Sequence, residues 1–458
     1  MNNRIFGTDG VRGTANVEPV TAETALKLGR AAAHVFKNLN TQARDRRKHK
    51  IVIGKDTRLS GYMLENAISS GILSMGVDVL FIGPLPTPGV AYITRSLRAD
   101  AGIVITASHN PYTDNGIKFF RADGYKLDDQ IEGQIEKLVF SGEIEKVRPA
   151  AEEIGKAVRI DDALGRYIEF AKAGFPKNLT LENMRIVVDC GNGAAYKASP
   201  CVLSELGADV IVVGNQPDGK NINENCGSMH PEDLCAKVVA HKAHIGIAHD
   251  GDADRVLLCD ENGVLADGDD IMAIAALDML AQGTLSAKTL VATVMSNAGL
   301  EAAIRKAGGN VIRTAVGDKN VIDELLKNGF NFGGEQSGHL IFRDFSTTGD
   351  GLVAALQILR IMRETGRPLS QLAKCWTRFP QLVTNVKVRE KVPFEKLDGV
   401  VAMVSAAELE LKSAGGRVLL RYSGTEPKAR LLVEGRDEED LKSWSQKICG
   451  AIQKQIGV

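Results

Sequence analysis

The sequence predicts an α/β protein with three similar α/β domains, each built on a mixed, mainly parallel sheet, and a C-terminal α+β domain, all around a central cleft. Three observations lead to this fold class. The chain has 458 residues, too many for one core. A strand–helix–strand pattern occurs three times, and it ends after about residue 370. The predicted domains cover residues 1–155, 156–258, 259–370 and 371–458.

Each of the three units begins with a short apolar strand, at residues 51–56, 186–191 and 290–294. A helix-like stretch follows, and a second strand then starts from a glycine, at residues 76–80, 207–211 and 308–312. The glycine is typical of a helix C-terminus, and the Asp or Asn near it of a turn. Crossovers of this length predict right-handed βαβ units and a parallel sheet.

The third strand of each unit runs into a polar loop. Residues 101–105 lead to Ser108, residues 245–249 to the acidic stretch 250–255, and residues 330–334 to residues 335–339. Ligands bind outside the carboxyl ends of the strands in open α/β sheets. If the three domains are copies, these loops occupy equivalent places and face one cleft.

The remainder of the chain predicts a small α+β domain. Strands are expected at residues 379–388, 417–422 and 430–434, and helices at residues 397–413 and 437–456. Three acidic residues in the first turn of the last helix suit the helix dipole.

Composition excludes several classes of protein. A hydrophobic content of 44% and a charged content of 25% are ordinary for a globular chain, and a net charge of −1 argues against a nucleic-acid partner. Seven scattered cysteines without a C-x-x-C pair indicate reduced thiols. The N-terminus has no apolar signal region, and no apolar segment reaches membrane length. We therefore expect a cytoplasmic protein with no membrane partner.

Asp250, Asp252 and Asp254 stand at alternate positions, which in extended chain places three carboxylates on one side. Such a group repels itself unless a cation lies within it, and hard oxygen ligands favour Mg²⁺. A calcium EF-hand is disfavoured, because Arg255 replaces the glycine of its turn and the flanking residues resemble strands. A phosphatase with Asp250 as nucleophile and a solvated acidic loop remain as alternatives.

A phosphate-binding loop is predicted between the last two strands. Arginine guanidinium groups, hydroxyls and the backbone N–H groups around a glycine can bind a phosphate dianion. A charged hairpin tip exposed to water would have the same sequence pattern. The residues are Arg421, Ser423, Gly424, Thr425 and Arg430.

Three further stretches carry candidate side chains. Glu335 and Ser337 lie in a glycine-flanked loop and could grip neighbouring sugar hydroxyls, while His339 of that loop could equally be structural. Lys118 follows the Ser108 loop on a strand-like stretch that could turn it back toward the serine, and Arg12 stands among glycines. Either cation could instead be exposed.

Four motifs occur together along the chain: TASHNP around Ser108, DGDADR from Asp250, GEQSGH around Glu335 and RYSGTEPKAR from Arg421. In this order they closely resemble the α-D-phosphohexomutase superfamily. FGTDGVRG near the first residue, and Gln336 in GEQSGH, resemble the branch that acts on glucosamine phosphate.

The resemblance implies a role for each motif. Ser108 matches the active-site serine, which carries a phosphate and completes a Mg²⁺ site with the three aspartates. Glu335 and Ser337 match a loop that binds the sugar hydroxyls. The residues named above between positions 421 and 430 match a distal phosphate-binding site. The residues that match charged groups lining the cleft are Arg12, Lys118, Arg255 and His339.

The implied reaction interconverts glucosamine 6-phosphate and glucosamine 1-phosphate through a 1,6-bisphosphate and feeds UDP-N-acetylglucosamine synthesis. A positioned acid or base must move the proton of the sugar hydroxyl, and Lys118 and His339 are both candidates. The same chemistry on phosphomannose or phosphoglucose, and a sugar-phosphate sensor without turnover, are alternatives. A homodimer is left open as the assembly.

Overall fold

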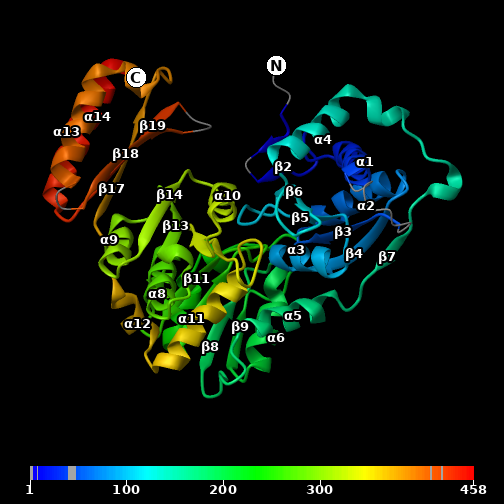
Figure 1. Ribbon diagram of the computed structural model, residues 1–458, viewed down its shortest axis with the longest axis horizontal. Coiled ribbons are helices and arrows are strands. Elements are labelled where there is room, and N and C mark those ends of the chain that lie inside the picture. The colour runs from blue at the N-terminus through cyan, green and yellow to red at the C-terminus, as the bar shows by residue number, and fades with distance from the viewer. Residues whose placement is uncertain (1–3, 8, 40–47, 413–414, 424–426) are drawn as a thin grey trace.

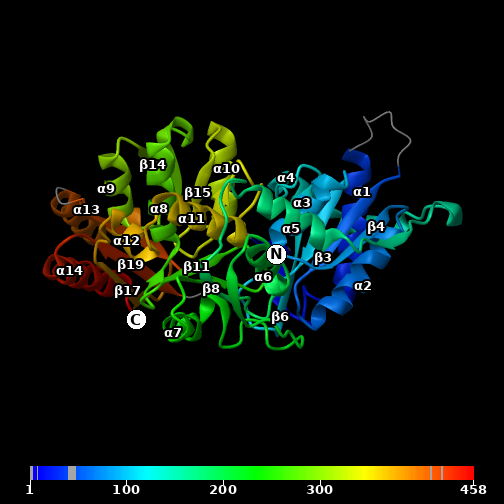
Figure 2. The same cartoon turned by 90° about the horizontal axis from the view of Figure 1, so that it is seen from below.

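The computed structural model describes residues 4–7, 9–39, 48–412, 415–423 and 427–458, which form four sheets with helices packed against them (Figure 1). In this described part, no helix combines the length and apolar character needed to cross a membrane. Figures 1 and 2 place the N-terminal and C-terminal domains at opposite ends of the molecule, with the second and third domains between them.

The first three sheets repeat one arrangement, in which the first strand of the unit is central, the second and third flank it in parallel, and a fourth strand closes antiparallel. In the order of the sheet, the strands of the first are β4 (Asp78–Pro84), β3 (Lys50–Lys55), β5 (Ala101–Ile105) and β6 (Asp114–Arg121). Those of the second are β9 (Asp209–Val213), β8 (Arg185–Asp189), β10 (Ile245–His249) and β11 (Val256–Asp260). Those of the third are β14 (Asn310–Thr314), β13 (Thr289–Thr293), β15 (Phe332–Gly334) and β16 (Leu340–Phe342). The predicted fold class is confirmed.

Short strands extend two of these sheets. β1 (Phe6–Gly7), β2 (Gly10–Thr14) and β7 (Ala157–Arg159) belong to the first sheet, and β12 (Leu265–Ala266) to the second. Strands of one sheet therefore lie on both sides of the predicted boundaries at 155/156 and 258/259, which stay predictions.

Helices pack against the sheets so that central strands such as β5 are buried along their whole length, which explains their continuous apolar runs. The helices of the first three domains are α1 (Ala22–Leu39), α2 (Ser60–Leu73), α3 (Thr87–Ser96), α4 (Asp129–Ser141), α5 (Ala163–Ala173), α6 (Ala198–Glu205), α7 (Glu232–Ala240), α8 (Gly268–Ala281), α9 (Ala298–Lys306), α10 (Asp318–Asn328), α11 (Gly351–Thr365) and α12 (Leu369–Leu372). One hydrophobic core runs from Val52 through Val188 to Leu356, so these three domains share buried contacts.

The fourth domain has a three-stranded antiparallel sheet in the order β17 (Gln381–Lys387), β19 (Lys428–Glu434) and β18 (Arg417–Tyr422). α13 (Asp398–Lys412) and α14 (Glu438–Ile456) pack against the sheet through a separate hydrophobic core. Asp437 caps α14 by accepting hydrogen bonds from two backbone amides of the first turn. These elements match the predicted ones, and residue 413 of the predicted helix lies outside the described residues.

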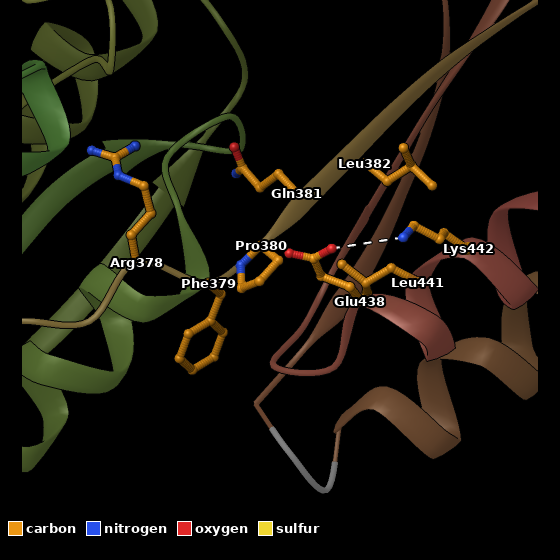
Figure 3. Close-up of a pocket in the computed structure, with 8 residues that line it drawn as sticks. All are labelled: Arg378, Phe379, Pro380, Gln381, Leu382, Glu438, Leu441 and Lys442. Atoms are coloured by element: carbon orange, nitrogen blue, oxygen red, sulfur yellow. Dashed lines mark ion pairs between the residues drawn. The ribbon is translucent and has the colours of Figure 1, made fainter.

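Polar contacts join the fourth domain to the third. The Asn297 side chain donates to the Phe379 carbonyl and accepts from the Phe379 amide, both at 2.9 Å. A pocket of about 470 Å³ lies at this joint, between residues 378–382 and the start of α14 (Figure 3). It contains none of the predicted site residues, which lie elsewhere on the sheets.

Candidate active site

Ser108 follows β5 in a left-handed backbone conformation (φ 51°) that residues other than glycine seldom adopt. Its amide donates to the Thr106 hydroxyl at 2.9 Å. Its carbonyl oxygen accepts from the Arg58 guanidinium and from the Asn223 side chain, each at 2.9 Å. Two domains thus hold a strained serine in one orientation, a feature that is concentrated at functional sites.

The Ser108 hydroxyl is buried and donates to Asp250 Oδ2 at 2.6 Å, so the polar loops of the first and second domains meet. His109 Nδ1 lies 3.3 Å from the same Oγ. Burial, together with the positive charges of Arg255 and Arg12, lowers the pKa of His109 to about 4. The sequence did not identify His109 as a site residue, because adjacency in the chain does not predict reach.

Asp250, Asp252 and Asp254 are buried, and one oxygen of each lies within 4.8 Å of the others. Burial, together with the charges of Asp254 and Asp252, raises the pKa of Asp250 well above its ordinary value. Oδ1 of Asp252 and Oδ1 of Asp254 are buried and find no hydrogen-bond partner within the described part of the chain. Converging hard oxygens with unsatisfied lone pairs fit a divalent cation.

Lys118 lies on β6, beside the triad. Its ammonium is 2.9 Å from Asp9 Oδ2, 3.1 Å from Asp252 Oδ2 and 3.5 Å from Asp254 Oδ2. Burial alone would lower the pKa of Lys118, but the carboxylates of Asp252, Asp9 and Asp254 outweigh it and hold the pKa well above its ordinary value. The lysine is therefore a fixed positive charge in this arrangement.

The two arginines proposed for the cleft are partly exposed. Arg12 Nη2 is 3.1 Å from Asp9 Oδ2, and Arg255 Nε is 3.8 Å from Asp254 Oδ1. They add positive charge beside the serine and the triad, where an anionic group would be attracted.

The 335–339 loop approaches from the third domain. Glu335 Oε1 accepts from the Gly317 amide at 3.0 Å, and Ser337 is exposed. His339 is buried, with Nε2 3.4 Å from Asp318 Oδ2 and 3.9 Å from Asp254 Oδ2. Loops of three domains therefore converge at the carboxyl ends of β5, β10 and β15.

The predicted phosphate-binding residues lie apart from this cluster. Arg421 on β18 and Arg430 on β19 are paired residues of the hairpin, and the Ser423 carbonyl accepts from Lys391 Nζ at 2.7 Å. Gly424 and Thr425 lie outside the described residues. Figure 1 shows this hairpin in the fourth domain, away from β5 and β6, so the structure does not bring Arg421, Ser423 or Arg430 to Ser108.

Besides His109, sequence reasoning missed five residues that the structure places in or beside the cluster. One of them is Thr87, whose hydroxyl donates to Asp252 Oδ2 at 2.7 Å. Arg58, Thr87 and Asp318 each follow a strand of the repeat, so the rule applied to the third strands would have found them if extended to the others. Asp9 precedes β2 and Lys126 follows the antiparallel β6, so the rule for parallel strands does not apply to them, and they become visible only when the domains are assembled.

Replacing Arg58 with methionine should lower the free energy of unfolding by about 3–5 kcal/mol, because it leaves the buried Asp56 carboxylate without the guanidinium that now lies 2.9 Å away. Denaturant titration measures the change. Arg159→Met is the matched control, since this exposed arginine pairs only with exposed Asp161, and it should shift stability by less than about 0.5 kcal/mol. Equal effects in the two variants would contradict the prediction.

Fold and site together define an enzyme of the phosphohexomutase class, an isomerase that acts on sugar phosphates. The chain belongs to the phosphoglucomutase/phosphomannomutase family. The models of its three alpha/beta/alpha domains match residues 3–146, 165–263 and 267–379, and the model of its C-terminal domain matches residues 383–451.

Among curated relatives, the phosphoglucosamine mutase of Syntrophotalea carbinolica is 57% identical over 100% of this chain and 99% of its own length. That of Geobacter metallireducens is 58% identical over 99% of each. Among solved structures, a phosphoglucomutase/phosphomannomutase family protein of Burkholderia thailandensis has a TM-score of 0.81 at 24% identity, covering 99% of both chains. The N-acetylphosphoglucosamine mutase of Aspergillus fumigatus, in complex with GlcNAc-6P and magnesium, has a TM-score of 0.64 at 17% identity, covering 98% and 95%. At these identities, the two structures show the fold alone.

Proposed function

We propose that this enzyme interconverts glucosamine 6-phosphate and glucosamine 1-phosphate through a phosphoserine at Ser108 and a 1,6-bisphosphate intermediate. The observation that carries the proposal is the 2.6 Å hydrogen bond from the Ser108 hydroxyl to Asp250, within a buried group of three carboxylates. Relatives named phosphoglucosamine mutase over the whole chain support the choice of sugar. The product would feed the synthesis of UDP-N-acetylglucosamine.

In the first half-reaction, a sugar hydroxyl oxygen attacks the phosphorus on Ser108, the bond from phosphorus to Oγ breaks, and the hydroxyl proton passes to a base. The second half-reaction returns the other phosphoryl group to Oγ. Asp250, Asp252 and Asp254 would hold Mg²⁺, which supplies neutralisation of the charge on the transferring group. The Lys118 ammonium lies beside Asp252 and would stabilise the negative charge of the phosphoryl oxygens. His339 is our candidate for the base that takes the hydroxyl proton, and Lys118, as a fixed positive charge, is our candidate for the acid that returns a proton to the sugar oxygen.

The bisphosphate must turn end for end between the two half-reactions, so a second site has to hold the phosphate that is not reacting. We assign this role to Arg421, Ser423, Gly424, Thr425 and Arg430 of the fourth domain. Movement of that domain about its joint with the third would let the intermediate turn. Glu335 and Ser337 would grip the sugar hydroxyls, and Arg12 and Arg255 would face the reacting phosphate.

The sugar assignment predicts that kcat/KM for glucosamine 6-phosphate exceeds that for glucose 6-phosphate and mannose 6-phosphate by about tenfold or more, because a site that binds the amine leaves polar groups unpaired when the amine is absent. Parallel rate measurements on the three 6-phosphates, at one Mg²⁺ concentration, test this. Equal or faster turnover of glucose or mannose phosphate would favour the alternative, a phosphomannomutase/phosphoglucomutase with the same mechanism.

A further inference from the structure

Within the described residues, the N-terminal end of α10 makes three ion pairs with the first domain, one from Asp318 and two from Lys319, whose Nζ also lies 3.6 Å from Glu132 Oε2. Asp318, the first residue of the helix, contacts Lys126 Nζ, which also lies 2.5 Å from Asp9 Oδ1. Lys319 Nζ lies 2.7 Å from Asp129 of α4. The pairs differ in burial: the Lys126 and Asp318 side chains are 13% and 14% exposed, whereas the Asp129 side chain is 78% exposed.

The buried pair leads into the candidate active site on both sides. The second oxygen of Asp9 forms an ion pair with Lys118 Nζ at 2.9 Å. Neither ring nitrogen of His339 has a hydrogen-bond partner among the described residues, and Asp318 Oδ2, 3.4 Å from Nε2, is a nearer carboxylate contact than Asp254 Oδ2 at 3.9 Å. A continuous series of contacts therefore runs from Lys118 through Asp9, Lys126 and Asp318 to the imidazole of His339.

We propose that Asp318 is a positioning residue for the mutase reaction, which orients His339 directly and holds Lys118 in place through Lys126 and Asp9. The inference rests on the proposed function, which places Lys118 and His339 beside the reacting groups. The contact between the first and third domains would then affect the rate of the reaction as well as hold the two domains together.

Two physical arguments support this role. A buried ion pair adds little net stability, yet losing one partner leaves an uncompensated charge that moves its neighbours. Removing the Asp318 charge frees Lys126 to draw Asp9 away from Lys118. A displacement of about 1 Å in a reacting group can cost about a hundredfold in rate. In addition, burial would raise the pKa of Asp318, but the Lys126 ammonium outweighs it and keeps the pKa below its ordinary value, so the charge is present at neutral pH.

The test compares Asp318→Asn with Lys319→Gln, two changes of one charge at adjacent positions in the same interface. The substrate is whichever 6-phosphate of glucosamine, glucose or mannose the wild type converts fastest, so an error in the proposed sugar leaves the test intact. We expect Asp318→Asn to lower kcat by roughly tenfold to a hundredfold with KM within about twofold. Lys319→Gln should keep wild-type kcat.

Lys126→Gln breaks the same link from the first domain and should lower kcat in the same way, which also covers a failure of Asp318→Asn to fold. In the double variant the two losses should not multiply, because either change breaks the link. The proposal would be overturned if Asp318→Asn had the same kinetics as Lys319→Gln, or if only KM changed. It would also be overturned if the two losses in kcat multiplied in the double variant.

Discussion

Replacing Ser108 with alanine is expected to lower kcat for sugar-phosphate interconversion by at least about a thousandfold, because the variant has no oxygen to carry the phosphoryl group between half-reactions. The fold should persist, since the backbone of residue 108 is held by Thr106, Arg58 and Asn223 rather than by its hydroxyl. Coupled assays of product formation measure the rate, and mass spectrometry of wild-type tryptic peptides should find phosphate on Ser108.

Ser70→Ala is the matched control. It removes a hydroxyl from the same domain, where that group donates only to the Asn66 carbonyl of its own helix, and it should leave kcat unchanged. Retention of full activity by Ser108→Ala would reject the serine as carrier. Phosphate on Asp250 instead of Ser108 would replace the mutase mechanism with that of an aspartate phosphatase.

Much of the fold could be predicted because the local signals and the tertiary structure agree. β5 and β10 are buried on both faces, so their apolar runs are continuous and end where the polar loops begin. Domain edges were harder to predict. β7 pairs with β4 across a predicted boundary, and its exposed three-residue sequence carries no apolar pattern that would assign it to either sheet.

The candidate site could be predicted where chemistry is dense in the sequence. Three aspartates at alternate positions after a strand are easily recognised in the sequence, and the structure confirms that they cluster. The link between Asp9 and Asp318 through Lys126 was different, because Lys126 joins residues that lie 117 and 192 positions from it in the chain. Such contacts depend on how the domains pack, and one chain without its tertiary structure contains no signal for them.

Replacing Asp250 with asparagine should have opposite effects on activity and stability. One ligand charge is lost, so kcat should fall by about a hundredfold or more, and more Mg²⁺ should be needed for half-maximal rate. Without a divalent cation, burial and the charges of Asp254 and Asp252 raise the pKa of Asp250 in the wild-type fold. A carboxyl group with a raised pKa binds its proton more tightly in the folded state, so the fold loses stability as pH rises above the ordinary value of 3.8. Asp250→Asn should not lose stability in this way, because asparagine does not ionise.

Thermal unfolding in chelator and in Mg²⁺ separates these effects. In chelator at neutral pH, Asp250→Asn should unfold at a higher temperature than the wild type, and Mg²⁺ should raise the midpoint of the wild type far more than that of the variant. Asp260→Asn is the control, because this carboxylate of the same domain accepts only from nearby backbone amides of its turn and lies outside the triad. If Mg²⁺ stabilised Asp250→Asn as much as the wild type, the carboxylate could not be a ligand. If Asp250→Asn unfolded at a lower temperature than the wild type in chelator, repulsion among the three carboxylates would not be what the cation relieves. The two readouts together distinguish a metal-binding group from a cluster whose role is only structural.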